Sequence, residues 1–272
     1  MANRYTDFVG ADASEEFGMR SLFTTMASLF LVAASSAQAE QKTMSMSDDV
    51  RMVAPGLEKY AAGPIADLSK RPGLSPRDRS IVTLSALIAR SQSHSLREGI
   101  YRALDNDVKP REISEIITHL AFYSGWSNAM EAVEAAKYVF TELKIAPDQL
   151  PPASPSLLPL DAEADAQRAN AVSAQFGKIA PGVVQYTTEV LFHDLWLRPD
   201  LAPRDRSLVT ISALIASGQV AQLSSHLTRA MNNGLTSTEV GEALTQLAFY
   251  AGWPNVFTAL PIVKDVIDKR LE

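Results

Sequence analysis

Apolar residues recur at helical spacing through most of the chain, and no segment alternates apolar and polar positions with the period of two typical of a strand. Residues 76–89 are apolar on nearly every face, which predicts a central buried helix. Ser75 and Pro76 supply an N-cap and a proline at the first helical position. Apolar side chains follow every four residues across 96–104, as on the inner face of a second helix. The pattern predicts an all-α protein.

The helical pattern is present twice. Residues 71–140 align with residues 198–267 without a gap, and 33 of the 70 aligned positions are identical. Such self-similarity indicates a duplicated domain. Between the copies, residues 146–163 are rich in proline, which predicts an extended, semi-rigid linker. We therefore expect one domain at 48–145 and a second at 164–272.

Both copies carry the same signals for close packing and for helix ends. Small residues such as Ser85 and Ser212 on the two central helices predict that another helix approaches closely. A capping box begins a later helix at Thr236, and Gly125 and Gly252 are expected to end the corresponding helix of each copy.

The first 39 residues have a different character. Residues 1–18 are polar and acidic without a helical or strand period, and we interpret them as an upstream extension. Across residues 19–39, a basic residue is followed by a short apolar run and an Ala-x-Ala site, the pattern of a secretory signal peptide that starts at Met19. We expect cleavage after Ala39, a periplasmic or secreted protein, and no stable membrane insertion afterwards. The alternative is an N-terminal membrane anchor or a buried helix.

Composition excludes several classes of function. The formal charge of −6, without any basic stripe, argues against a nucleic-acid partner. The chain has no cysteine, which excludes disulfides, thiolate metal ligands and dithiol redox chemistry. Its four histidines are widely scattered, so we expect no dedicated metal site.

Three motifs occur in both copies: Pro-Arg-Asp-Arg-Ser before the central helix, Arg-Ala-x-x-Asn after the next helix, and Leu-Ala-Phe-Tyr-x-Gly-Trp. In these motifs the chain resembles the carboxymuconolactone decarboxylase family of the alkylhydroperoxidase D-like superfamily. The resemblance covers nearly all of the expected mature chain except the linker. It implies an all-helical protein that forms a homo-oligomer. Because subunits pair in single-domain relatives, it also implies that the two copies form an internal pseudo-dimer.

The redox branch of this family uses a Cys-x-x-Cys pair, a histidine four residues beyond the second cysteine, and an upstream glutamate. In the second copy these positions hold Gln219, Gln222, His226 and Ser207. In the first copy they hold Gln92, Ser95, Gly99 and Ser80. Because peroxide reduction needs a thiolate nucleophile, we expect no thiol-dependent peroxidase activity.

The resemblance leaves decarboxylation open. We expect a cofactor-independent, decarboxylase-like lyase that acts on a small carboxylated lactone or a related organic acid. Loss of carbon dioxide from such a lactone requires that the protein hold the carboxylate, stabilise the developing oxyanion and protonate carbon, and it needs no metal or organic cofactor. His226 matches the family's histidine and is expected to be the acid or base, with Arg206 holding the anion. The candidates for substrate binding are Ser207, Gln222, Tyr250, Trp253 and His119.

Each of these residues also has a structural interpretation. His226 is equally consistent with a helix-face histidine bonded to a neighbour, and Arg206 with an arginine that pairs with Asp205 or a helix end. His119 fits a polar core position, because the second copy has glutamine there. Aromatic residues on apolar helix faces, such as Tyr250, are mostly part of a core.

The alternative function is a non-catalytic helical protein that binds a small acid or serves as an assembly scaffold. Two observations favour it. The first copy has Gly99 in place of the family's histidine, so at most one family-like site is present in the chain. Export would also separate the protein from the catabolism of such lactones, which is normally cytoplasmic.

The N-terminal pattern leads to a direct test. Mass spectrometry of the native protein should find an N-terminus at Glu40, because the Ala-x-Ala site ends at Ala39. Recovery of an intact form that begins at Met1 or Met19 from the cytoplasm would contradict the expectation of export.

Overall fold

The computed structural model describes residues 46–271 of the chain. The predicted upstream extension and signal peptide lie outside these residues, and their assignment stays a prediction. The described residues contain helices and turns and no strand, so the prediction of an all-α fold is confirmed. They fall into two compact units, and the boundary along the chain lies between Ala66 and Asp67.

The first unit is a short helical segment. It contains α2 (Met46–Val53), α3 (Pro55–Tyr60) and the π-helical η1 (Ala61–Ile65). Arg51 on α2 forms an ion pair with Glu58 on α3 at 2.5 Å. The short helix α4 (Ala66–Leu68) leads into the second unit.

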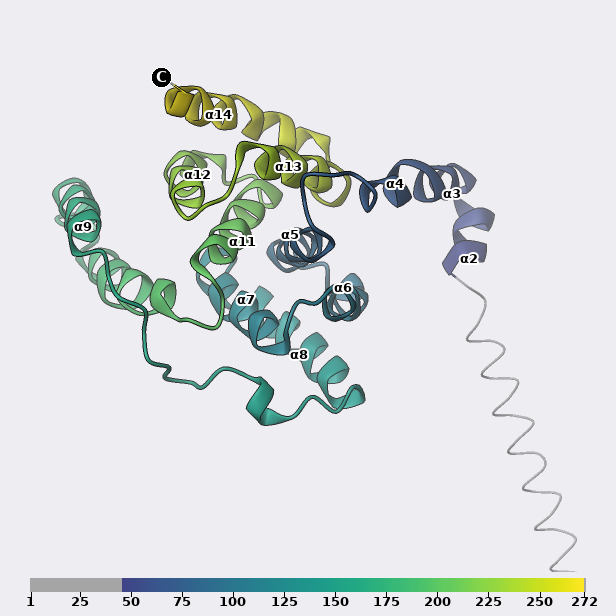
Figure 1. Ribbon diagram of the computed structural model, residues 1–272, viewed down its shortest axis with the longest axis horizontal. Coiled ribbons are helices and arrows are strands. Elements are labelled where there is room, and N and C mark those ends of the chain that lie inside the picture. The colour runs from purple at the N-terminus through teal and green to yellow at the C-terminus, as the bar shows by residue number, and fades with distance from the viewer. Residues whose placement is uncertain (1–45, 272) are drawn as a thin grey trace, which may run out of the picture. The chain divides into compact units, whose positions relative to one another are not determined.

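The second unit contains the repeated four-helix arrangement (Figure 1). The first copy consists of α5 (Pro76–Ala89), α6 (Ser93–Asp105), α7 (Pro110–Tyr123) and α8 (Trp126–Glu142). The second copy consists of α11 (Pro203–Ala216), α12 (Leu223–Asn232), α13 (Ser237–Ala251) and α14 (Trp253–Leu271). The chain between them forms η2 (Pro147–Gln149), α9 (Ala162–Phe176), α10 (Pro181–Tyr186), the π-helical η3 (Thr187–Phe192) and η4 (Leu195–Leu197), and η5 (Val220–Gln222) precedes α12. Two tandem helical domains are thus present, as the sequence predicts.

The helix boundaries follow the local signals. The Ser75 hydroxyl accepts a hydrogen bond from the backbone N–H of Asp78 at 3.0 Å and caps α5. Thr236 and Glu239 form the predicted capping box of α13. Gly125 and Gly252 have φ values of 94° and 92°, in the left-handed region that favours glycine.

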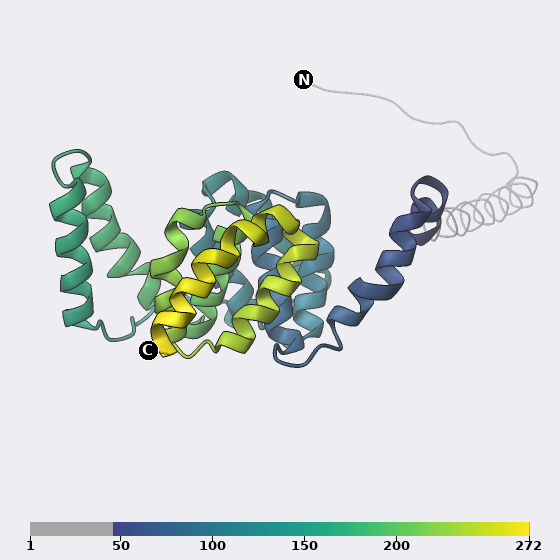
Figure 2. The same cartoon turned by 90° about the horizontal axis from the view of Figure 1, so that it is seen from above.

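The central helices of the two copies, α5 and α11, pack against each other. Figures 1 and 2 show the other helices of the two copies arranged around this pair. Residues 78–89 and 205–216 are buried throughout. Their small side chains permit the close approach that the sequence predicts. The hydroxyl of Ser85 is satisfied within α5, where it donates to the carbonyl of Ile81 at 2.7 Å.

Buried ion pairs join the two copies reciprocally. Arg79 of the first copy donates to Glu242 of the second at 2.9 Å, and Arg206 of the second donates to Glu115 of the first at 2.9 Å. The Arg206 and Glu115 side chains are both fully buried. Equivalent residues therefore exchange partners, as in an isologous dimer interface. The expected internal pseudo-dimer is present.

A second set of ion pairs repeats this exchange at the start of the central helices. Arg77 contacts Glu112 in its own copy at 2.6 Å and Asp205 in the other copy at 2.8 Å. Arg204, its equivalent, contacts Glu239 and Asp78 in the same way. The arginines before each central helix thus serve the contact between the copies.

The predicted linker runs along the second copy. After η2 it has no regular structure until α9 begins at Ala162. Arg198, which also contacts Glu115, donates to the carbonyls of Pro152 and Ala153 at 3.1 and 2.9 Å. The Pro-rich segment is therefore held by hydrogen bonds, while the domain boundaries at 145 and 164 stay predictions.

Within the described part of the chain, no helix has both the length and the apolar character needed to cross a bilayer.

The buried ion pair between Arg206 and Glu115 predicts how much stability is lost when the pair is broken. Glu115→Gln leaves the fully buried Arg206 without its counter-charge and should lower the free energy of unfolding by about 3–5 kcal/mol. Urea unfolding measures this loss. Glu98→Gln is the control, since its pair with Arg102 is exposed and should be worth less than about 1 kcal/mol. Equal losses in the two variants would show that the buried pair does not hold the copies together.

Candidate functional site

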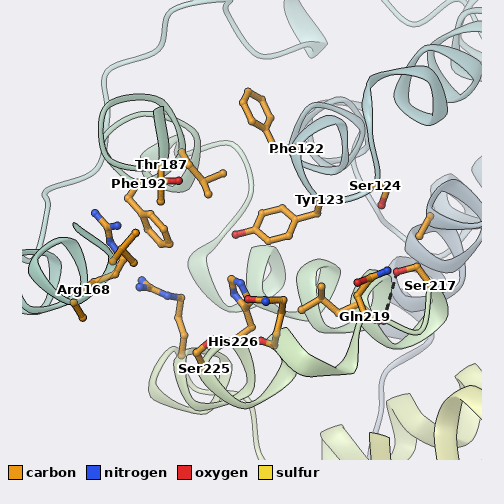
Figure 3. Close-up of a pocket in the computed structure, with 17 residues that line it drawn as sticks. Phe122, Tyr123, Ser124, Arg168, Thr187, Phe192, Ser217, Gln219, Ser225 and His226 are labelled. Atoms are coloured by element: carbon orange, nitrogen blue, oxygen red, sulfur yellow. Dashed lines mark hydrogen bonds between the residues drawn. The ribbon is translucent and has the colours of Figure 1, made fainter. Parts of the chain in front are cut away.

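A pocket of about 720 Å³ lies against α12 of the second copy. The second copy lines it with residues of α12 and the preceding turn, and α9 and η3 contribute Arg168 and Phe192. The first copy contributes the end of α7, with Tyr123 and Phe122. Figure 3 shows Tyr123, Phe192 and His226 facing the same space. The site is thus built from both copies.

His226 lines this pocket. Its Nδ1 is buried and unsatisfied among the described residues. Burial, and after it the charge of Arg229, lower the pKa of His226 from its ordinary value of 6.5 to about 4. The imidazole is therefore neutral at neutral pH, with a ring nitrogen that no described protein group satisfies.

Aromatic rings hold His226 on two sides. The Trp196 ring stacks on it with centroids 6.0 Å apart, and the Tyr123 ring meets it edge-on at 5.3 Å. Trp196 donates its indole N–H to the Tyr123 hydroxyl at 2.9 Å. His119 stacks behind Tyr123 at 4.7 Å. These contacts restrict the orientation of every ring around the pocket.

Two guanidinium groups lie at one end of the pocket. Arg229, one turn after His226 on α12, has no hydrogen bond and no ion pair among the described residues. It is partly buried, with its guanidinium 5.0 Å from the Phe192 ring centroid and 5.1 Å from that of Trp196. Arg168 lies 4.0 Å from Phe192 and pairs with Asp165, but its Nη1 is buried without a partner. Asp161 and Asp165 act on Arg229 only through space, so its guanidinium keeps N–H donors that no described residue engages.

Burial is the largest influence on the pKa of Arg229 and lowers it. The guanidinium nevertheless stays charged at neutral pH, because the ordinary pKa of arginine lies far above 7. A partly buried guanidinium that makes no direct hydrogen bond or ion pair favours an anionic ligand, because burial has removed part of its hydration and no described residue bonds to its N–H groups. The Ser124 hydroxyl, also buried and unsatisfied, lines the same pocket. The arrangement can bind an anion and transfer a proton beside it.

The structure brings two of the predicted site residues to the pocket and leaves the others elsewhere. His226 and Gln222 line it. Arg206 lies in the buried face of α11, where Nη2 donates to Glu115 and to the carbonyl of Arg198, each at 2.9 Å. Its guanidinium is thus engaged between the copies, away from the pocket lining.

Ser207 and His119 are both buried and do not line the pocket. The Ser207 hydroxyl donates to the carbonyl of Pro203 at 2.8 Å and accepts from Asn233 at 2.9 Å. The His119 ring nitrogen Nε2 is 2.8 Å from the Thr210 hydroxyl. Burial lowers the pKa of His119 well below its ordinary value, and the charge of Arg206 adds to this effect. His119 supports the pocket through its stacking on Tyr123, whereas Ser207 bonds to Pro203 and Asn233, which lie outside the lining.

Tyr250 and Trp253 do not line the pocket with His226, and Trp253 is half exposed. Their places are taken by the equivalent end of α7, which carries Tyr123 and Phe122. The physical reason is that α7 of the first copy packs on α11 of the second, so each copy presents its Leu-Ala-Phe-Tyr motif to the other copy. Sequence reasoning placed the aromatic wall within one copy and therefore chose the wrong tyrosine for this wall.

Sequence reasoning also missed Arg229, Trp196 and Phe192. The spacing in the sequence could have indicated Arg229, because it follows His226 by three residues and so shares its helix face. Trp196 and Phe192 lie upstream of the second copy's central helix and gave no such signal. Within the described residues, no three histidine or acidic side chains gather as a metal site would require.

The corresponding position in the first copy carries different residues. Gly99 takes the place of His226, and a Cβ on it would come 2.8 Å from Cδ1 of Leu87. Arg102, equivalent to Arg229, is exposed and pairs with Glu98 at 2.9 Å. Among the described residues, the family's histidine and an unpaired arginine therefore occur together in the second copy.

The similarity to known proteins falls in both copies of the domain. Residues 56–138 and residues 181–265 each match the carboxymuconolactone decarboxylase family, which confirms the resemblance. A 4-carboxymuconolactone decarboxylase of Acinetobacter baylyi is 38% identical over 73 residues, 27% of this chain and 54% of that protein. A nitrosuccinic acid decarboxylase of Metarhizium robertsii is 34% identical over 86 residues, 30% of this chain and 60% of that protein. The chain thus spans little more than half the length of these relatives.

The neutral histidines predict how stability depends on pH. The folded pKa of His226 is about 4, below the ordinary value of 6.5, so between these values the unfolded chain binds a proton that the folded chain does not. The free energy of unfolding should therefore fall as the pH drops from 6.5 to 4, by at most about 1.4 kcal/mol per pH unit for each such histidine.

His226→Gln should make this decline shallower, and urea unfolding at pH 7, 5.5 and 4.5 measures it. The control is His94→Gln, an exposed histidine on α6, which should keep the decline of the unaltered protein. If His226→Gln declines as steeply as the unaltered protein, His226 is not held neutral by its surroundings.

Proposed function

Since the chain belongs to the carboxymuconolactone decarboxylase family, we propose that it is a cofactor-independent, decarboxylase-like lyase for a small carboxylated lactone or a related organic acid. The relatives named as decarboxylases of 4-carboxymuconolactone and of nitrosuccinic acid support this class of substrate. A pocket of about 720 Å³ has the size of ligand sites for small molecules, roughly 300–1,000 Å³.

One observation carries the proposal: the unpaired Arg229 lies one turn from the unsatisfied His226 in the same pocket. An anionic substrate would form the direct ion pair that Arg229 lacks among the described residues. The same negative charge, held where water is largely excluded, would raise the pKa of His226 and let it take up a proton. Binding would thus prepare the acid that the reaction needs.

The chemistry can be assigned group by group. When the carbon–carbon bond to the carboxylate breaks, carbon dioxide leaves and the electron pair moves into the conjugated carbonyl, which becomes an enolate. His226, protonated in the complex, then gives its proton to carbon and forms the new carbon–hydrogen bond. Arg229 binds and orients the anion, the role that sequence reasoning gave to Arg206. We prefer Arg229 because Arg206 is already paired with Glu115.

The apolar part of the pocket also has a role. Phe122, Leu214 and Ala89 line it away from the two arginines. A departing carboxylate loses its charge as carbon dioxide forms, so an apolar surrounding favours the transition state over the charged ground state. A retained carboxylate or the enolate oxygen would face the arginine end.

A non-catalytic protein that binds a small acid is the second candidate. It is favoured by the low pKa of His226, because the unliganded imidazole carries no proton to donate at neutral pH. It also agrees with the loss of the histidine from the first copy. In this function Arg229 would still bind the acid, and no carbon dioxide would be released.

A panel of small carboxylated lactones, β-keto acids and nitro-substituted dicarboxylic acids tests the two functions. Release of carbon dioxide from a panel member supports the lyase. Given such a substrate, His226→Gln should lower kcat by roughly a hundredfold or more, because it removes proton transfer but keeps the size of the side chain. Arg229→Gln should chiefly raise KM. His94→Gln, on the surface of α6, should leave both constants unchanged.

The outcomes separate the candidates. Binding of panel members, measured by calorimetry, without release of carbon dioxide would favour the binding protein. If His226→Gln keeps full turnover but lowers the melting temperature, His226 is a core residue and the proposed role is wrong.

A further inference from the structure

We infer that Tyr123 of the first copy supplies the hydrogen bond that stabilises the developing oxyanion in the pocket of the second copy, with Trp196 as its positioning residue. This inference deepens the proposed function and rests on it. It assigns the stabilisation of the oxyanion, a role that the proposed function gives to neither His226 nor Arg229.

The direction of the hydrogen bond between the two rings is unambiguous. An indole N–H can only donate, so the Tyr123 oxygen must accept the bond from Trp196 at 2.9 Å. The phenol keeps its own proton, and this proton has no acceptor among the described residues. Figure 3 shows the hydroxyl pointing into the space between Phe192 and His226. The group is therefore a donor aimed at the pocket.

The ring is held from behind by a buried network. His119 stacks on Tyr123 with an interplanar angle of 24°, and its Nε2 bonds the Thr210 hydroxyl. Its other nitrogen lies 3.4 Å from Arg206, which is paired with Glu115. A donor fixed in this way needs little rearrangement when charge develops, the condition for effective oxyanion stabilisation.

The electrostatic surroundings suit a donor and not a base. Burial raises the pKa of Tyr123 to about 12, so the phenol keeps its proton at neutral pH. The nearby charges of Arg229 and Arg206 act in the opposite direction and place a positive potential at the hydroxyl. An oxyanion that formed here would be favoured both by the hydrogen bond and by this potential.

The differences between the copies point to the same group. The position equivalent to Trp196 is Ser69, and the position equivalent to His119 is Gln246. Because the copies are arranged reciprocally, the surroundings of the other tyrosine, Tyr250, would correspond to those of Tyr123. They would include Ser69 and Gly99 of the first copy and Gln246 of the second. Residues that orient a tyrosine donor beside a histidine thus occur together around Tyr123 and not around Tyr250, although both tyrosines are present.

A pair of ligands tests the assignment without turnover. 3-Nitropropionate, ionised to its nitronate, combines a carboxylate with a planar oxyanion that resembles an enolate, whereas succinate has a carboxylate in its place. Calorimetry at pH 9.5 should show that the full-length protein prefers the nitronate. Tyr123→Phe should weaken nitronate binding about tenfold or more and change succinate binding less than about twofold.

Tyr250→Phe is the matched control and should keep the preference for the nitronate. Trp196→Phe keeps an aromatic ring but loses the indole donor, and should show a partial loss of the preference at an unchanged affinity for succinate. His226→Gln should keep the preference, because the oxyanion donor is intact. Melting temperatures of all four variants establish that they fold.

On a substrate from the decarboxylation panel, Tyr123→Phe should lower kcat by about 10²–10³-fold with little change in KM, the usual loss for one oxyanion donor. If Tyr123→Phe keeps both the nitronate preference and kcat, the assignment is overturned. If the nitronate preference depends on Tyr123 but no panel member releases carbon dioxide, the proposed lyase fails while Tyr123 remains the donor to a bound oxyanion.

Discussion

Arg206 and Glu115 form an ion pair that is fully buried and joins the two copies of the domain. Neither charge can lose the other without a large desolvation cost, so the pair holds α7 of the first copy against α11 of the second. The symmetric pair of Arg79 and Glu242 holds α5 of the first copy against α13 of the second. With α7 in this position, the ring of Tyr123 at its end lies 5.3 Å from the ring of His226.

Duplication supplies two equivalent positions for a site, and these positions carry different residues in the two copies. The arginines and glutamates that join the copies are present in both. By contrast, the second copy has His226 where the first has Gly99, and Trp196 where the first has Ser69. Groups that hold the structure are therefore repeated, whereas groups that can bind and protonate a ligand gather at one pocket. A chain with two symmetric interface halves can keep its fold with a single site.

The charges of that pocket suit the anionic substrate that we propose. Arg229 is unpaired, and His226 is neutral because burial and the nearby guanidinium disfavour its protonated form. An anion would remove both disadvantages at once, since it pairs with the arginine and favours the imidazolium. Binding and proton uptake are thereby linked in the same few groups. A hydroxyl donor opposite, held by an indole and an imidazole, completes an environment suited to an enolate.

By itself, the sequence determined the helices, their caps and the duplication, and it singled out His226 as a candidate. These properties depend on local periodicity, on capping side chains and on motifs that are read within one segment. Only the tertiary structure decided that Arg206 serves the contact between copies and that Arg229 lines the pocket with no hydrogen bond or ion pair among the described residues. The two arginines look alike in sequence, and what separates them is burial beside a glutamate 91 residues away. The aromatic wall was decided in the same way, because helix packing across the pseudo-dimer brings in Tyr123 and leaves Tyr250 outside.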